Sequence, residues 1–341
     1  FIAEGEPMQV HSFAGTPFDI SDVPSRHPYS LALWQRDFER ILGGWVDELG
    51  VSMLRGCEVT GFAQDDTGVD VRFPVDEKGA DVLLVVPSAD FFAEPHVDSL
   101  IGYAKVFHAA GVSWTLSSHA SEAGNFGLFI GSYDQLRTIA MRIREAALEL
   151  GVKRIVVGEC GHAWRVAYSM WNTLAGIGAG GEDDFARKLQ SQLDSRYKQP
   201  MHICEFTHDL IGRGALRLDR EANDHRVVTF HDSCNVARAS RMGDMPGGQF
   251  EIPRAIIRAV ANHYVEMAPG TTHDATFCCG GGGGLLTDEL LDLRVKGALP
   301  RMEALRQVAD QGGVNFMATI CAICKAQFTK VLPYYGFDMS M

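Results

Sequence analysis

Two adjacent cysteines followed by five glycines, in the stretch DATFCCGGGGGLL at residues 274–286, constrain this chain more than any other feature. Three more cysteines lie near them, so that five of the eight fall within residues 234–324. Cys234 is separated from the pair by 43 residues. Cys321 and Cys324 form a C-x-x-C motif that is separated from Cys279 by 41 residues. A fold that uses these five thiols together must bring three separate segments to one place.

Short apolar segments alternate with helical patterns in the first part of the chain. The expected strands are residues 81–86, 112–116 and 153–157, and the expected helices are residues 96–110 and 133–150. Strands that alternate with helices are typical of a parallel sheet in an α/β layer.

The same alternation recurs in the second part. We expect strands at 226–230 and 314–319, helices at 252–266 and 297–311, and a further helix after Cys321. The recurrence predicts an α/β protein with two pseudo-repeated units that have parallel sheets, preceded by a short helix and strand-pair segment. The predicted boundaries are 1–73 for this segment, 74–200 for the first unit and 201–341 for the second.

Alignment of the two units by pattern indicates that the first has lost most of its thiols. The alignment pairs Ser88 with Cys234, Cys160 with Cys324, and Val157 with Cys321, and it places no cysteine opposite the adjacent pair. The first unit is therefore expected to be a degenerate copy.

Composition narrows the function classes. With 46% hydrophobic and 22% charged residues, the chain has the composition of a soluble globular protein, and its apolar runs are far shorter than the roughly 20 residues that cross a bilayer. A net charge of −12 without a dense Lys/Arg stripe argues against a nucleic-acid partner. Eight cysteines are too few for a secreted disulfide scaffold, so their clustering indicates metal or redox chemistry in a reducing compartment such as the cytoplasm.

The five thiols are expected at the carboxyl edge of a sheet, where ligands gather in open α/β folds. A structural zinc site normally uses four ligands, so it fits five thiols poorly. A redox pair at Cys321 and Cys324 would leave the other three thiols idle. An iron–sulfur cluster suits several thiolates that lie close together, and glycine backbone at Gly280, Gly281 and Gly282 can approach its sulfides and donate N–H groups.

The spacing C, CCG, CxxC resembles the CCG domain of heterodisulfide reductases and related iron–sulfur subunits. The segments VVPSADFF and SSHASEAGNFGLFIG are most similar to DsrK-like members, which belong to the DsrMKJOP membrane complex, and the resemblance covers about residues 74–341. The resemblance implies a noncubane 4Fe-4S cluster in the second unit and none in the first. The ligands that it implies are Cys234, Cys278, Cys279, Cys321 and Cys324.

The function that this resemblance implies is electron transfer in dissimilatory sulfur metabolism. Such a protein would reduce, or in reverse oxidise, a disulfide or trisulfide of a DsrC-like small thiol protein. It would be cytoplasmic and attached to the membrane through other subunits of a redox complex. Two alternatives stay open: a non-catalytic iron–sulfur electron-transfer subunit of another dehydrogenase complex, and a zinc-stabilised interaction module.

The chain departs from this resemblance in two ways. It contains no ferredoxin-like C-x-x-C-x-x-C-x-x-x-C-P run. Residues 3–73, with VPSRHPYSLALWQRDFERIL and EVTGFAQDDTGVDVRF, resemble a fragment of a flavin-dependent aromatic polyketide hydroxylase. No G-x-G-x-x-G unit is present in that fragment, so we do not expect it to bind flavin. We expect from it a helix at about 31–49 and a strand pair around residues 65–68.

Four further side chains are candidates for catalysis. His231 and His162 could protonate a leaving thiolate, Cys160 could face the substrate, and Lys325, like Arg238, could offset thiolate charge or bind an anion. The alternatives are hydrogen-bonded structural histidines, a small buried hydrophobe and solvated surface charges. We also expect a cleft in the first unit, lined by Ser88, His119, Glu122, Asn125, Cys160 and His162.

Overall fold

The computed structural model describes two α/β units and a few short strands before them. It describes residues 73–86, 94–120, 122–123, 127–128, 131–171, 197, 200–240, 249–283 and 286–341, together with the strands β1 (Ile2–Ala3), β2 (Glu6–Pro7), β3 (Val10–Phe13), β4 (Thr16–Asp19), β5 (Ala63–Asp65) and β6 (Gly68–Asp70). The antiparallel pairing of β5 with β6 confirms the strand pair expected around residues 65–68. The helix expected at 31–49 lies outside the described residues.

The first unit is built on a parallel sheet with the strand order β10-β9-β7-β8. Its strands are β7 (Val82–Val85), β8 (Trp114–Thr115), β9 (Arg154–Val157) and β10 (Met201–His202). All four residues of β7 are buried, as expected for a central parallel strand that is covered on both faces.

Helices cover both faces of this sheet. Helices α2 (Glu94–Ala109) and α9 (Ile203–Gly212) pack against one face, where Phe107 and Phe206 contact Val82 and Leu84 in one apolar cluster. Helices α4 (Tyr133–Leu150) and α5 (Gly161–Ser169) pack against the other face. Strand β10 pairs with β9, and helix α9 packs on this sheet. The first unit therefore includes residues beyond the boundary expected at residue 200.

The second unit repeats the central part of the first. Its parallel sheet has the order β12-β11-β13, with strands β11 (Val227–His231), β12 (His263–Tyr264) and β13 (Phe316–Thr319). In both units the first strand along the chain lies between the second and the third. Its helices are α10 (Glu251–Val260), α11 (Leu291–Gly312) and α12 (Ala322–Val331). The predicted duplication of α/β units with parallel sheets is confirmed.

One predicted element of the second unit is wrong. The helix expected at 252–266 ends at Val260, because Ala261 is extended, with φ −134° and ψ 143°. The chain then enters β12, whose His263 and Tyr264 pair with the start of β11. Aromatic and β-branched residues at this point favour a strand over another helical turn.

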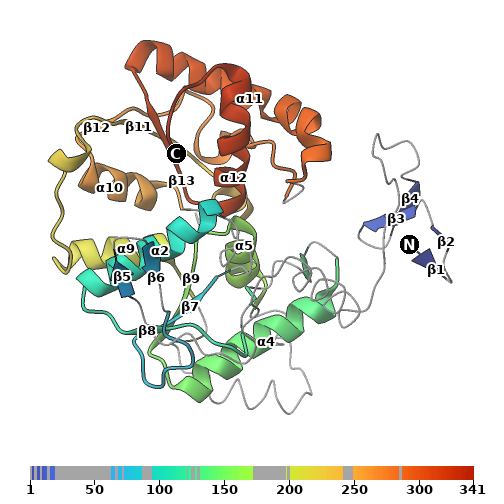
Figure 1. Cartoon of the computed structure of the whole chain (residues 1–341), viewed down its shortest axis with the longest axis vertical. Coiled ribbons are helices and arrows are strands. Elements are labelled where there is room, and N and C mark those ends of the chain that lie inside the picture. Colours follow the sequence, from blue (N-terminus) through green and yellow to red (C-terminus); the bar gives the residue numbers. More distant parts are fainter. Residues whose placement is uncertain are drawn as a thin grey trace.

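The two units share one apolar core. A single cluster of buried side chains includes Cys160, Ala163 and Trp164 of the first unit and Cys321 and Phe328 of the second. Figure 1 shows the second unit, in orange and red, with α12 next to α2 and α5 of the first unit, and α12 contacts α2 directly. None of the helices in the described part of the chain combines the length and the apolar character that a membrane crossing requires.

Candidate metal centre

Three loops of the second unit bring the five predicted cysteines to one edge of its sheet. Cys234 lies in the turn that follows β11, and Cys321 caps the N-terminus of α12 directly after β13. Cys324 lies in the first turn of α12, and the adjacent cysteines follow the short 3-10 helix His273–Ala275. The site therefore lies at the carboxyl ends of parallel strands, as predicted.

The five thiols form a connected row. Hydrogen bonds join Cys234 to Cys278, Cys278 to Cys279, Cys279 to Cys324, and Cys324 to Cys321. Cys279, Cys321 and Cys324 are buried, Cys234 is half-buried, and Cys278 is exposed. The row therefore opens to solvent at Cys278.

The hydrogen bonds within the row separate the acidities of the thiols. Those from Cys234 and Cys279 lower the pKa of Cys278 to about 2, and that from Cys324 lowers the pKa of Cys321 to about 7. The same bonds raise the pKa of the thiols that donate them, at Cys234, Cys279 and Cys324. The arrangement thus favours the thiolate form at Cys278 and Cys321, and thiolate is the form that binds metal.

The glycine run brings backbone N–H groups to the adjacent cysteines. The Gly280 N–H group lies 3.4 Å (N to Sγ) from Cys278, and that of Gly281 lies 3.4 Å from Cys279. Gly280 has a φ of +85°, and a Cβ atom there would lie 2.6 Å from the backbone nitrogen of Ala298 in α11. Gly282 continues the turn at a φ of +56°. Glycine at position 280 is required by both the conformation and the close approach of α11.

The first unit forms one wall of the site. The N–H group of Gly161, at the start of α5, donates to Cys321, and a Cβ atom at Gly161 would lie 3.3 Å from the Cys321 sulfur. The carbonyl oxygen of Glu159 accepts the N–H of Ala322 at 3.3 Å. The degenerate unit therefore contacts the segment that carries the C-x-x-C motif.

His162 also reaches the site from the first unit. Its Nε2 atom accepts a hydrogen bond from Asn235 Nδ2 at 3.0 Å, and Asn235 Nδ2 lies 3.6 Å from the sulfur of Cys234. Burial, assisted by the charge of Arg165, lowers the pKa of His162 to about 4. The imidazole is therefore neutral near pH 7, with Nε2 as the acceptor.

His231 lies at the end of β11 and is fully buried. Its ring packs edge-to-face on Phe328, with the centroids 4.8 Å apart. Burial and the charge of Arg301 lower its pKa well below the usual value, while the charge of Cys278 opposes this shift. Among the described residues, neither ring nitrogen has a hydrogen-bond partner. The structure thus places an uncharged imidazole beside the thiols.

The other candidates lie around the junction of the two units. Lys325 Nζ forms an ion pair with Glu159 Oε1 at 2.9 Å and a hydrogen bond with the hydroxyl of Ser99, so its charge is matched by the first unit. Cys160 is buried, with 2% of its surface exposed, at the N-terminus of α5. Arg238 donates to the carbonyl oxygen of Thr276 at 2.9 Å.

The cleft expected in the first unit is described only in part. Ser88 and Asn125 lie outside the described residues. His119 pairs with Glu145 of α4 at 3.2 Å, with about half of its side chain exposed. Of the expected cleft residues that the structure describes, Cys160 and His162 lie at the start of α5, where this helix meets the thiols.

The alignment of cysteines between the two units needs one correction. Cys160 and Cys321 each cap the N-terminus of the helix that follows the third strand of their unit. Cys160 is therefore the counterpart of Cys321, whereas the sequence alignment pairs it with Cys324. Two residues separate β9 from its helix cap and one residue separates β13 from its cap, so the two loops correspond closely in length.

Two residues at the site were not predicted from the sequence. Asn235, directly after Cys234, links that thiol to His162. Arg301 is fully buried on α11, on the same face as Ala298 and Leu305. A charged residue within an otherwise apolar stripe is the signal that could have revealed Arg301.

The donor set fits an iron–sulfur cluster. In the part of the chain that the structure describes, no three Cys, His, Asp or Glu side chains form a group that could hold a metal ion as it stands. The thiols are linked in pairs along a row, and several irons that each take one or two thiolates suit such a row. Backbone N–H groups already point at three of the sulfurs, which is how proteins stabilise the charge of such clusters.

Comparison with known proteins agrees with this geometry. Residues 228–329 match the family described as CCG, Cysteine-rich domain, and this range contains all five thiols. The chain is 39% identical over 297 residues to Hdr-like menaquinol oxidoreductase iron-sulfur subunit 2 of Archaeoglobus fulgidus. This alignment covers 82% of this chain and 52% of that protein. This chain thus spans about half the length of the curated relatives that it matches first.

Two other relatives are similar over shorter segments. One of the subunits of the dihydromethanophenazine:CoB–CoM heterodisulfide reductase of Methanosarcina mazei is 26% identical over 193 residues, covering 56% of this chain and 39% of that protein. The 12-dehydrotetracycline 5-monooxygenase/anhydrotetracycline 6-monooxygenase of Streptomyces rimosus is 41% identical over 73 residues, covering 21% of this chain and 14% of that protein. The second match, to a monooxygenase, is 73 residues long. This is about the length of the amino-terminal segment, residues 3–73, that resembles a hydroxylase fragment.

Proposed function

We propose that this chain, a heterodisulfide-reductase-like CCG iron–sulfur protein, exchanges electrons with the S–S bond of a thiol partner at a noncubane 4Fe-4S cluster. The chain is similar to iron–sulfur electron-transfer oxidoreductase subunits, and the disulfide chemistry and the cluster type are our proposal. The observation that carries it is the row of five thiols with a single exposed member, Cys278. Such a row offers one open face to a substrate sulfur and buries the remaining ligands.

The proposed ligands are Cys234, Cys278, Cys279, Cys321 and Cys324. The N–H groups of Gly280 and Gly281 stabilise negative charge on the adjacent pair, and Gly282 keeps the loop free of side chains at the open face. When bound, the cluster supplies electrons one at a time. Reduction of a disulfide consumes two electrons and two protons and releases two thiols, and a trisulfide is cleaved in the same way, with one product carrying the extra sulfur.

The proton routes are proposed for side chains around the row. His162 is linked through Asn235 to Cys234, and His231 is near enough to Cys278 for their charges to interact, so these two imidazoles are the proposed proton carriers toward a leaving thiolate. Cys160 belongs to the apolar core that the two units share, and Lys325 ties α12 to Glu159, so both support the wall of the first unit. In the reverse direction the same groups take up protons from substrate thiols.

The partners are proposed from the relatives. A DsrC-like small thiol protein is the proposed substrate, and other subunits of a membrane-bound redox complex would provide or accept electrons on the cytoplasmic side. The names of the relatives include parts of a menaquinol oxidoreductase and of a heterodisulfide reductase, which supports a redox complex and a substrate with an S–S bond. The acidic net charge of −12 gives no support for nucleic acid.

The proposal is tested by electron paramagnetic resonance of the anaerobically purified, oxidised chain, with and without a reduced DsrC-like protein. A partner whose cysteines are alkylated is the matched control. We expect a new or shifted signal with the thiol form and none with the alkylated form. A cluster whose spectrum is identical in all three samples would contradict the disulfide chemistry.

That last outcome would favour a second function. In it, the chain passes electrons within a quinol-linked complex and meets no thiol substrate. The names of the first two relatives, both menaquinol oxidoreductase iron-sulfur subunits, are the observation in its favour. Reduction of the cluster by a quinol analogue in the reconstituted complex, without any thiol effect, would establish it.

A further inference from the structure

Arg301 is a buried cation with unused hydrogen-bonding capacity beside the thiol row. Its side chain has no solvent exposure. Nη2 donates to the carbonyl oxygen of Thr271 at 2.6 Å and to the hydroxyl of Thr276 at 2.9 Å. Its Nε and Nη1 atoms have no hydrogen-bond partner among the described residues. Three N–H bonds of a buried guanidinium, one on Nε and two on Nη1, are thus left for another acceptor.

No carboxylate near Arg301 in the described part of the chain is free to balance its charge. Asp232 acts on it, but Arg254 binds both oxygens of Asp232, at 2.8 and 2.7 Å. The backbone N–H of His273 also donates to Asp232, at 2.9 Å. The remaining groups that act on Arg301 are the sulfurs of Cys324, Cys279 and Cys278, and of these Cys278 favours the thiolate form. The sulfur site is therefore the natural counter-charge of this arginine.

Burial of a guanidinium without a matched anion is costly. The penalty for one buried ion is several kcal/mol, and it is offset where an anion and further hydrogen-bond acceptors meet the cation. Arginine does not lose its proton to avoid that penalty. Burial lowers the pKa of Arg301 to about 10, which still leaves it charged near pH 7.

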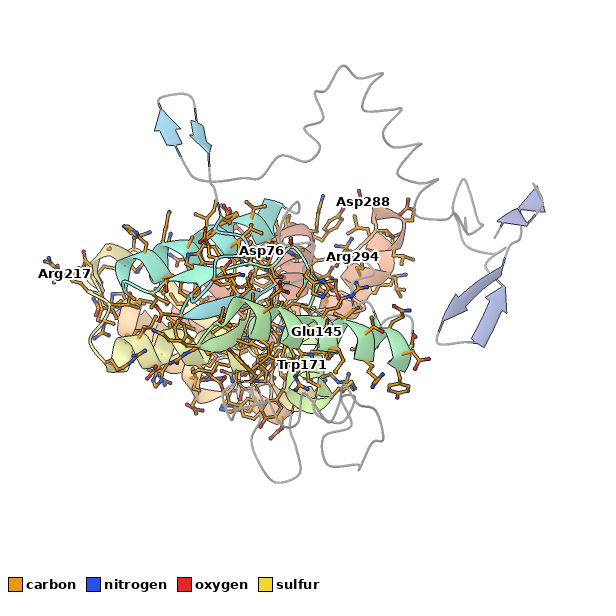
Figure 2. All side chains as sticks on the ribbon, turned by 90° about the horizontal axis from the view of Figure 1, so that it is seen from below. Asp76, Glu145, Trp171, Arg217, Asp288 and Arg294 are labelled. Carbon is orange, nitrogen blue, oxygen red and sulfur yellow. The ribbon has the colours of Figure 1, made fainter. Side chains whose placement is uncertain are left out.

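The other buried cations around the site are already satisfied. Arg294 donates to Gln327 at 2.8 Å and to the carbonyl oxygen of Thr287 at 3.0 Å, and Figure 2 shows it within the body of the molecule while Asp288 lies at the outer edge. Arg254 is held by Asp232 and by Glu266. Among the described buried arginines of the second unit, Arg301 alone has buried nitrogen atoms without a hydrogen-bond partner.

We propose, on the basis of the proposed cluster site, that Arg301 is a fixed positive charge and N–H donor that raises the reduction potential of the cluster. A buried cation stabilises the more negative, reduced state more than the oxidised state, and hydrogen bonds to sulfur act in the same direction. Arg301 is a positioning residue in this role, because it sets the electrostatics of the site and does not exchange electrons or protons.

The test compares Arg301→Gln and Arg301→Lys with Arg144→Gln in the full chain. Arg144 is a matched control in the first unit: it is also fully buried, and its Cζ atom lies 5.7 Å from the ring of Trp171, as that of Arg301 lies 5.7 Å from Phe277. Burial, without any thiol, lowers its pKa to about 10. Iron and sulfide are measured first, and a redox titration followed by electron paramagnetic resonance comes second.

We expect Arg301→Gln to keep its iron and to lower the ratio of reduced to oxidised cluster at least tenfold at a fixed potential, which corresponds to ~59 mV for a one-electron couple. Arg301→Lys and Arg144→Gln should stay close to the unmodified chain. An unchanged ratio in Arg301→Gln with full iron would overturn the inference.

If Arg301→Gln loses its iron, the Arg301→Lys variant decides whether the charge of Arg301 acts on the cluster. Full iron with an unchanged ratio in the lysine variant supports the role of the charge, and loss of iron or a tenfold lower ratio there overturns it. An unmodified chain without iron or sulfide would instead refute the proposed cluster function, so the two failures are distinguishable.

Discussion

At the scale of residues, the five sulfurs are chemically unequal although the sequence presents them as one motif. Cys278 is exposed and carries the lowered pKa, whereas its neighbour Cys279 is buried and donates to it. This inequality follows from the glycine backbone and from the row of hydrogen bonds. We infer that Cys278 marks the face where a partner sulfur arrives.

Single Cys→Ser changes at positions 234, 278, 279, 321 and 324 should each lose or convert the cluster, because a serine hydroxyl is a poor substitute for a soft thiolate ligand. Cys204→Ser is the control, since Cys204 packs in the apolar cluster on the other face of the first sheet. Iron content and the visible spectrum measure the outcome. Retention of an unaltered cluster in any of the five variants would remove that cysteine from the ligand set.

His162→Ala should leave iron content intact and slow reduction of a disulfide partner by about 100-fold, which is ~2.7 kcal/mol of transition-state stabilisation. The reason is that His162 reaches Cys234 through Asn235. Cys160→Ala, at the same wall, is measured in the same assay. His119→Ala is the control, because His119 pairs with Glu145 on the surface. Full activity of both wall variants with intact iron would exclude the first unit from the mechanism.

At the scale of elements, the prediction succeeded where a helix or strand carries its own end signals. The helix at 133–150 was predicted with its observed bounds, because Ser132 caps its start and Gly151, at a φ of +63°, ends it. The strand before Cys234 was correct to within one residue at each end. The place of Cys234, Cys321 and Cys324 also followed from their positions after strands of one parallel sheet, whereas the adjacent pair follows a short 3-10 helix.

Other features depend on tertiary contacts that the sequence pattern does not contain. Tyr264 fits a helical pattern, yet it lies in a strand because β11 offers an unpaired edge. His162 accepts a hydrogen bond from Asn235, and Arg301 donates one to the carbonyl oxygen of Thr271. Both partners are distant in the sequence and belong to other elements. Such contacts could not be predicted from local periodicity.

The glycine loop provides a prediction at this scale. Gly280→Ala should destabilise the chain by about 3 kcal/mol, because strain at a positive φ adds to a clash with α11; a Cβ atom would lie 2.8 Å from the Arg294 carbonyl oxygen. Gly297→Ala, on the facing helix, meets Gly280 at an ordinary 3.5 Å and should be neutral or slightly stabilising. Urea unfolding measures both. Equal stability of the two variants would contradict the close packing of this loop.

At the scale of the whole molecule, the site depends on two units of which only one carries the thiols. The degenerate unit has kept its sheet, its helices and the N-terminus of α5, which donates to Cys321. The ion pair between Lys325 and Glu159 ties α12 to the same region. The duplication thus remains functional as a wall, although the first copy has lost its own set of cysteines.

The amino-terminal segment should be dispensable for the cluster. A chain that starts at Lys78 is expected to keep its iron, since the five thiols and the glycine N–H groups that donate to them all lie after this residue. It should nevertheless be about 2 kcal/mol less stable than a chain that starts at Phe73, because it loses hydrogen bonds of Pro74, Asp76 and Glu77 to the strand around Leu116. Iron analysis and urea unfolding of both chains provide the test. Loss of iron from folded chains of either length would show that the segment belongs to the core.

The most direct test of the central claim, that the second unit holds one iron–sulfur cluster, is the metal and sulfide content of the anaerobically purified chain. We predict about four irons and four sulfides per chain, with the iron lost on Cys279→Ser and kept on Cys204→Ser. Stoichiometric zinc without sulfide in the unmodified chain would contradict the account.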